Sequence, residues 1–296
     1  MVLALCASST LAGATAQAAD VPLVIAAEQR TVAGGRTVQI ILPQTRIETT
    51  FDVGRVASSA NGGGLLGASI ISSMDDKREK LSQSAHERAE ARIAPLRQAL
   101  QGFDIDALVM STTKSAVAKP AWFQPASFAI TNDPGIETRT DFLASLKSPQ
   151  YVVIAYRYET SPDFTQIRVL AEIRLGRAGT MKRGAPALTI LYGQRIVSIV
   201  QLRNPSFEPS ENVARWTADD SQLAKAALTS AFARLEGLIP FALDLSDTQV
   251  KAITAKGREK AFAAGFYGPR VERYPAVTGE TLIWKDGLVN VQSAGD

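Results

Sequence analysis

The chain has 296 residues, 46% of them hydrophobic, and its 32 Lys and Arg against 29 Asp and Glu give a net charge of +3. This apolar fraction is typical of a soluble globular protein. So small a positive charge argues against a nucleic-acid-binding protein, which needs a strongly basic face. With one histidine and one cysteine, the sequence offers too few ligands for a zinc site, and we expect no metal and no cofactor.

The N-terminal residues have the pattern of a secretory signal peptide. A short apolar stretch ends in Ala16-Gln17-Ala18, the small-x-small sequence that signal peptidase accepts. We therefore expect residues 1–18 to be a signal peptide and the protein to be exported to the periplasm.

Cys6 raises the alternative of a lipid anchor. A lipobox has Gly, Ala or Ser before its cysteine, whereas Leu5 stands there, so a lipid anchor at Cys6 is not expected. Cleavage after Ala18 would remove the only thiol. We expect residues 19–296 to form a single domain, with a subdivision near 114–150 as the alternative.

The first half of this domain predicts two strands and a long helix. Residues 37–42 and 46–57 are expected to be strands, and Ile47, Thr49, Phe51 and Val53 alternate with polar neighbours, as one buried face requires. A charged helix is expected from about residue 75 to 100, kinked at Pro95, because apolar residues recur there at steps of three and four. His86 lies in this helix, where a lone imidazole without partners predicts no site.

A glycine-rich run, Gly62–Gly67, precedes this helix. It lacks the Gly-Lys-Ser/Thr ending with which a phosphate-binding loop grips its ligand. Leu65, Leu66 and Ile70 are candidate membrane contacts. The alternative is a flexible entry into a helix that packs on the sheet.

Residues 105–112 predict a further strand, and residues 114–150 an irregular segment with a short helix near 140–147. Asp104 and Asp106 would place two carboxylates on one face of that strand, and such groups can act as a general acid and a general base. Aspartate is also common at such positions for turn formation alone. The sequence indicates no partner for either carboxylate.

Ser111-Thr112-Thr113-Lys114 matches the S-x-x-K motif of penicillin-interacting serine enzymes. On a helix, this spacing brings the amine beside the hydroxyl and lets it act as a base. The companion Ser-Asp-Asn and Lys-Thr-Gly motifs are absent from the sequence, and the motif follows a predicted strand. An enzyme using Ser111 and Lys114 is therefore kept as an alternative.

The clearest block of the sequence predicts an antiparallel meander. Its expected strands are 151–158, 167–175, 188–192 and 196–202. Gly193-Gln194 is expected to form a tight turn between the last two strands. Residues 176–186 are expected to form a basic, glycine-containing loop.

Two helices are expected after the meander. The first begins near Thr217 and stops at Pro240, because proline cannot continue the hydrogen-bond ladder. The second has Ser246 and Gln249 as a capping box and ends at Gly265.

Asp286-Gly287 indicates a final hairpin between strands at 281–284 and 288–291. The order of elements predicts the α+β class, in which an antiparallel β-meander carries segregated helices packed on the sheet.

Basic side chains outnumber acidic ones in the meander. We expect a binding surface formed by Arg157, Arg168, Arg174, Lys182 and Arg183. Such a surface suits an acidic envelope protein or an anionic envelope polymer. The alternative is a solvated sheet face whose arginines prevent aggregation at an edge.

Three stretches together resemble a group of uncharacterised proteobacterial periplasmic and envelope lipoprotein-like proteins. They are the signal segment, the Gly62–Gly67 run before a charged helix, and the Ser161-Pro162-Asp163-Phe164 turn inside the meander. The resemblance implies a location in the cell envelope and no particular mechanism. Cys6 departs from the lipobox of the lipoprotein-like members.

The sequence as a whole favours an exported envelope protein that binds or helps to assemble an envelope component and is not an enzyme. One alternative is a serine-dependent hydrolase or transpeptidase-like enzyme using Ser111 and Lys114. Another is a peripheral membrane protein that docks through Leu65, Leu66 and Ile70.

Overall fold

The computed structural model describes residues 21–50, 87–133, 141–182, 185–273 and 275–295. Its helices are α1 (Ala27–Arg30), α3 (Ile105–Ala118), α5 (Pro209–Asp244) and α6 (Asp247–Thr254), with further helical residues at 87–99 and 141–144. Its strands are β1 (Arg36–Ile41), β2 (Glu48–Thr49), β3 (Pro125–Thr131), β4 (Gln150–Thr160), β5 (Gln166–Lys182), β6 (Ala185–Gln201), β7 (Lys260–Ala263), β8 (Phe266–Pro269), β9 (Glu280–Trp284) and β10 (Leu288–Ser293).

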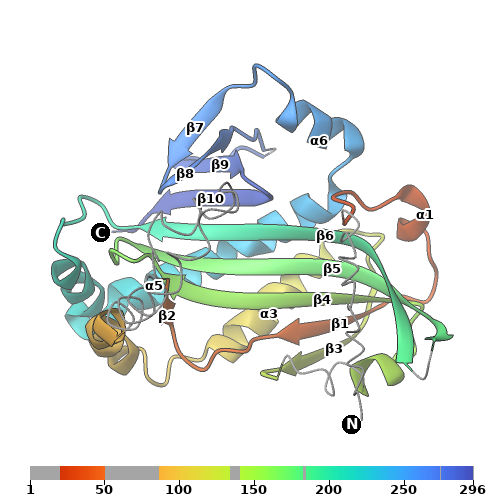
Figure 1. Cartoon of the computed structure of the whole chain (residues 1–296), viewed down its shortest axis with the longest axis horizontal. Helices are drawn as coiled ribbons and strands as arrows, with labels where there is room; N and C mark the ends of the chain where they lie inside the picture. The colour runs from red at the N-terminus through yellow and green to blue at the C-terminus, as the bar shows by residue number, and fades with distance from the viewer. Residues whose placement is uncertain (1–20, 51–86, 134–140, 183–184, 274, 296) are drawn as a thin grey trace, which may run out of the picture.

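The strands form one large mixed sheet and a separate hairpin (Figure 1). The order across the sheet is β3-β1-β4-β5-β6-β10-β9, and β2 pairs with β4 beyond the end of β1. Neighbours are antiparallel from β4 to β6 and between β10 and β9, whereas β1 pairs in parallel with both β3 and β4, β2 with β4, and β10 with β6.

The predicted fold class, α+β built on an antiparallel meander, is therefore wrong. The protein is mixed α/β, with a mixed central sheet and one long helix packed on it. Parallel neighbours need a long crossover. Here the segment containing α3 joins β1 to β3, and the segment containing α5 joins β6 to the C-terminal strands. Alternation along a strand reveals its buried face but not the direction of its neighbours.

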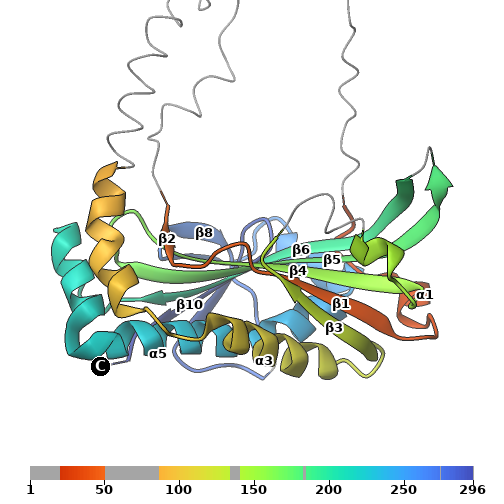
Figure 2. The same cartoon turned by 90° about the horizontal axis from the view of Figure 1, so that it is seen from below.

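Helices α3 and α5 lie on the same side of the sheet (Figure 2). The main core is formed between them and the sheet, and its largest fully buried side chains include Trp216, Tyr156, Tyr192, Phe123, Phe164 and Phe232. The hydroxyl groups of Thr113 on α3 and Tyr156 on β4 lie 2.8 Å apart, at hydrogen-bond distance. Burial raises the pKa of Tyr156, so its phenol stays protonated and tethers the helix to the sheet.

The strand predicted at 105–112 is wrong, because these residues begin helix α3. Asp104 is the N-cap, and its carboxylate accepts a hydrogen bond of 2.8 Å from the backbone N–H of Ala107. The buried residues Val109, Thr112, Thr113, Ala116 and Val117 recur at helical spacing. A short apolar run fits a strand or a helix equally well by composition. Here the N-cap residue Asp104 is the local signal that identifies a helix.

The loop predicted at 176–186 and the turn predicted at Gly193-Gln194 are also wrong. Strands β5 and β6 have 17 residues each and continue through both regions. Gly193 pairs with Arg174 inside the sheet, and its N–H donates to the carbonyl of Pro22 over 2.9 Å. A Cβ atom at Gly193 would lie 2.7 Å from Val21 Cγ1, so the glycine admits the N-terminal segment rather than a turn.

Helix α5 begins at Pro209, before the predicted start at Thr217, and continues through Pro240 to Asp244. It is broken at residues 218–221, where Asp219, Asp220 and Ser221 have positive φ. By length and composition alone α5 could cross a membrane. In the structure its apolar side chains, among them Phe232, Leu235 and Ile239, are buried on the sheet.

The C-terminal predictions are confirmed in part. Ser246 and Gln249 form the expected capping box of α6, and Asp286-Gly287 connects β9 to β10 in an antiparallel hairpin. However, α6 ends at Thr254, and the β7–β8 hairpin begins at Lys260, so that Gly265 lies in the turn of this hairpin.

Candidate functional site

The side of the sheet opposite α3 and α5 carries the charged residues of the meander. The odd-numbered residues 167–175 of β5 lie in the core under the helices. Because successive side chains of a strand point to opposite faces, Arg168, Glu172 and Arg174 point away from the helices. Arg157 and Glu159 of β4 and Arg195 of β6 share this side, since Glu159 pairs with Arg168 and Glu172 with Arg195.

One part of this side is covered by the β7–β8 hairpin. A second apolar cluster joins the hairpin to the sheet, formed by Leu170, Val197, Ile199, Ile283, Val289, Ala261, Ala263, Ala264 and Phe266. Another part of this side is covered by the helical residues 141–144, whose Phe142 and Leu143 pack against Tyr151 of β4. We call the charged surface beside these covered parts the open face and define it by Arg157, Glu159, Arg168, Glu172, Arg174 and Arg195, of which Arg168 lies against Phe266 of the hairpin.

The open face has a mixed and net positive charge, with four arginines and two glutamates. Arg157, Glu172, Arg174 and Arg195 are exposed, whereas Glu159 and Arg168 are partly buried. Glu172 and Arg174 are 3.9 Å apart. Burial raises the pKa of Glu159, although Arg168 and Arg195 act in the opposite direction. Burial also lowers the pKa of Arg168, whose guanidinium lies 5.5 Å from the ring of Phe266.

The structure brings together part of the predicted binding surface. Arg157, Arg168 and Arg174 share the open face. Lys182 ends β5, eight residues beyond Arg174 and thus roughly 26 Å along the strand. Arg183 lies outside the described residues. Sequence reasoning left Arg195 out of the surface, because the false turn at Gly193-Gln194 hid its register with Glu172.

The predicted serine motif lies on α3, not after a strand. Ser111 and Lys114 are both exposed. The Ser111 hydroxyl donates to the carbonyl of Leu108 over 3.0 Å, and the Lys114 ammonium lies 5.6 Å from the ring centre of Phe128. No described hydrogen bond joins the two side chains, and neither lines the cavity described next.

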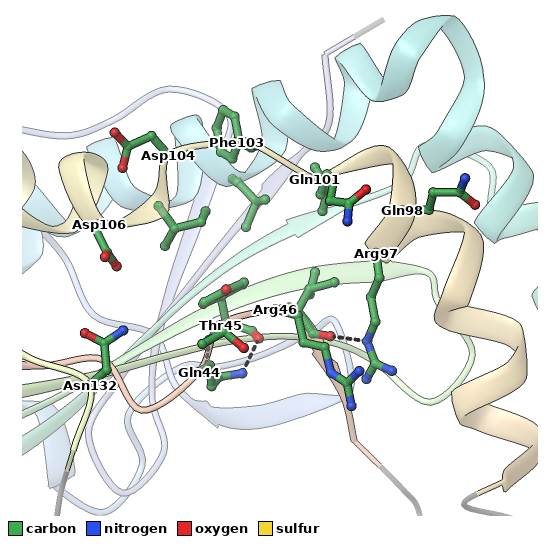
Figure 3. Close-up of a pocket in the computed structure, with 16 residues that line it drawn as sticks. Gln44, Thr45, Arg46, Arg97, Gln98, Gln101, Phe103, Asp104, Asp106 and Asn132 are labelled. Atoms are coloured by element: carbon green, nitrogen blue, oxygen red, sulfur yellow. Dashed lines mark hydrogen bonds between the residues drawn. The ribbon is translucent and has the colours of Figure 1, made fainter.

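A polar cavity of about 560 Å³ lies beside the start of α3 (Figure 3). One wall is the segment from Arg97 to Asp106, which connects the helical residues 87–99 to α3. The other wall is the β1–β2 connection (residues 44–47), together with Asn132 after β3 and Tyr158 on β4. Leu228 of α5 also contributes to the lining.

Two side chains hold the walls of this cavity in place. Gln44 donates from Nε2 to the Tyr158 carbonyl over 3.0 Å and accepts from the Tyr158 N–H over 2.9 Å. Arg97 donates from Nε to the Ile47 carbonyl over 2.8 Å and binds both carboxylate oxygens of Glu90. The β1–β2 connection is thus tied to the sheet on one side and to the helix on the other.

Tyr158 contributes a phenol that stays protonated. Burial raises its pKa to about 12, and the nearby carboxylates of Asp106 and Glu48 act in the same direction. Asp104 and Asp106, predicted as a carboxylate pair on a strand, instead occupy the N-cap and the first turn of α3. Both line the cavity.

Other predicted sites fall outside the described residues. His86, Leu65, Leu66 and Ile70 belong to this group, as does the signal segment. Among the residues that the structure describes, no group of three or more His, Cys, Asp or Glu side chains gathers in a way that could hold a metal ion.

Comparisons with known proteins return no relative. No protein-family profile, curated protein sequence or solved structure matches the chain significantly.

Proposed function

We propose that the protein is an exported component of the bacterial cell envelope that binds a partner protein through the open face and is not an enzyme. The observation that carries this proposal is a sheet face bearing four arginines and two glutamates, on the side of the sheet away from α3 and α5. The signal-peptide pattern at the N-terminus supports the location.

The pattern of charge favours a protein over a polyanion as the partner. Glu159 and Glu172 lie in register with Arg168 and Arg195 on neighbouring strands. A uniformly anionic polymer would meet repulsion at both glutamates, whereas a protein surface can place acidic groups opposite the arginines and basic or neutral groups opposite the glutamates.

The arginines also suit recognition more than stability. The Glu172–Arg174 pair is exposed, with side chains 55% and 57% accessible, and such pairs add little to the free energy of unfolding. An arginine fork binds carboxylates in a defined geometry, which adds specificity.

Site-specific crosslinking tests the proposal. A photoreactive amino acid in place of Ala155, which pairs with Glu172 on the open face, should capture a defined partner in the native envelope. The same group in place of Lys251, exposed on α6, should not. Arg157→Glu with Arg174→Glu should weaken binding of that partner by about tenfold or more.

The matched control for charge reversal is Lys251→Glu with Lys256→Glu, two exposed residues away from the open face. This variant should bind the partner like the wild type. Equal capture at both crosslinking positions, or binding that survives the arginine reversal, would contradict the proposal.

A further inference from the structure

The polar cavity beside α3 divides its side chains into two groups. Gln44, Arg97 and Asp104 are occupied by hydrogen bonds that hold the backbone. A second group lines the same cavity and makes no side-chain hydrogen bond within the described chain, namely Thr45, Gln98, Gln101, Asp106 and Asn132. All five are exposed to solvent, and no described residue uses the hydrogen-bonding capacity of their side chains.

The unused groups face one another across the cavity. In Figure 3 Gln101 and Asp106 extend from the wall that leads into α3, and Thr45 and Asn132 lie on the opposite wall. A molecule between the walls would meet amide donors, amide and carboxylate acceptors, and a hydroxyl. Polar groups that converge on a cavity of this size are typical of small-molecule sites.

The charges of the lining favour a ligand without a large net charge. Arg46 and Arg97 balance Asp104 and Asp106, and Arg97 is already bound to Glu90 on both carboxylate oxygens. The Arg97 guanidinium is therefore not available to bind a phosphate or a carboxylate, and the basic group that remains is that of Arg46. Arg46 is 66% exposed and lies 3.9 Å from the same Glu90.

The lining also has an apolar component. Leu100, Phe103, Ile105 and Leu228 contribute to it, beside the ring-bearing Tyr158. A sugar ring carries hydroxyl groups that both donate and accept, together with C–H faces that pack on apolar side chains. Amide side chains pair with such hydroxyls in either direction.

We propose that this cavity is a binding site for a short neutral oligosaccharide of about two rings, held by Gln101, Asp106 and Asn132. A volume of about 560 Å³ lies within the range of pockets that enclose ligands of this size, which is about 300–1,000 Å³. The inference is independent of the open face, since the cavity is built from α3, α5 and the β1–β2 connection.

Calorimetry and saturation-transfer NMR on the whole protein test this site, with chitobiose, cellobiose and maltose as probes. At least one of these disaccharides should bind at about 10 mM, a concentration that reveals even millimolar affinity. Asn132→Ala and Gln101→Ala should each weaken that binding by about three- to tenfold, the effect of one lost hydrogen bond.

Gln222→Ala is the matched control, because Gln222 is an exposed glutamine on α5 outside the cavity. It should bind the disaccharide like the wild type, and so should Arg157→Glu with Arg174→Glu. Circular dichroism of each variant shows that the fold is retained.

Three outcomes would overturn the site. One is the absence of binding for all three disaccharides, and another is binding unchanged in both cavity variants. The third is binding of the zwitterionic dipeptide alanyl-alanine in place of the sugars, which would show that the charged ends of the cavity dominate.

Discussion

Charged side chains are exposed on one side of the central sheet and buried on the other. On the open face Glu172 and Arg174 remain more than half exposed and 3.9 Å apart. On the helix side Arg36 of β1 is fully buried and Glu280 of β9 is 5% exposed. Burying a charge is costly unless it is fully hydrogen-bonded or paired. We conclude that the interior charges hold the structure together, whereas the exposed pair on the open face adds little to the free energy of unfolding.

Arg36 shows how an interior cation is accommodated without a carboxylate. Its guanidinium donates to four backbone carbonyl groups, those of Trp122, Phe123, Gln29 and Arg30, over 2.8–3.3 Å. The ring of Trp122 lies 4.9 Å away. One side chain thus joins the N-terminal segment, β1 and the turn before β3.

The largest expected effect is that of removing this clamp. Arg36→Met leaves buried carbonyl groups without donors and should lower the free energy of unfolding by about 3–5 kcal/mol. Arg36→Lys should recover little, because an ammonium cannot reach the four carbonyls that the planar fork joins. Urea denaturation measures both values. Arg174→Met on the open face is the control and should change stability by less than about 0.5 kcal/mol; similar losses for Arg36 and Arg174 would break the comparison.

Glu280 gives the second test, because it lies between two arginines from different parts of the chain. Its carboxylate forms ion pairs with Arg234 of α5 and with Arg273, 3.8 Å away, and accepts a hydrogen bond of 3.0 Å from Asn290. Glu280→Ala leaves both cations near one another without a counter-charge. The variant should lose about 2–4 kcal/mol of stability in urea denaturation.

The control for Glu280 is Glu172→Ala, which breaks the exposed pair with Arg174. It should cost less than about 0.5 kcal/mol. A double-mutant cycle of Glu280→Ala with Arg234→Ala should show coupling of about 1–3 kcal/mol, since the residues are in contact. Additive effects would mean that the buried ion pair does not stabilise the fold.

The sequence predicted individual elements better than their arrangement. The capping box at Ser246 and the hairpin at Asp286-Gly287 were predicted because a few adjacent residues determine them. The parallel pairing of β1 with β4 joins residues over 110 positions apart, and no local pattern encodes it. The strand predicted at 105–112 failed because composition alone cannot separate a short apolar strand from a helix.

The candidate sites show the same limit. Arg168 and Arg174 were predicted because strand alternation places them on one face, and Arg157 because basic residues outnumber acidic ones in the meander. The cavity was not, because Gln101 and Asn132 are 31 positions apart and polar side chains outside any motif carry no signal in one sequence. Asp104 and Asp106 were predicted as a pair on one strand face. They are instead the N-cap residue and a first-turn residue of α3.

The smallest expected effect concerns Glu159, where the open face meets the interior. Burial raises its pKa above the ordinary value of 4.5, so the folded state binds the proton more tightly than the unfolded chain does. The protonated carboxyl therefore contributes stability that is fully present below about pH 4. This stability is lost as the pH rises through the raised pKa and the group ionises. Glu159→Gln should raise the midpoint temperature of thermal unfolding slightly at pH 7. The gain in the free energy of unfolding should be less than about 1 kcal/mol, because the group is partly solvated.

The gain in Glu159→Gln should shrink as pH falls below about 4.5, where the wild-type carboxyl is protonated in both states. Thermal scans of both proteins between about pH 3.5 and 7 measure this difference. Glu172→Gln, more than half exposed on the same face, should show no comparable pH-dependent gain. A stabilised Glu159→Gln variant that also binds the crosslinked partner less well would mean that the open face keeps an ionised glutamate for recognition at the expense of stability. A variant that is destabilised at pH 7 would instead show that Glu159 belongs with the interior charges, held by Arg168 and Arg195.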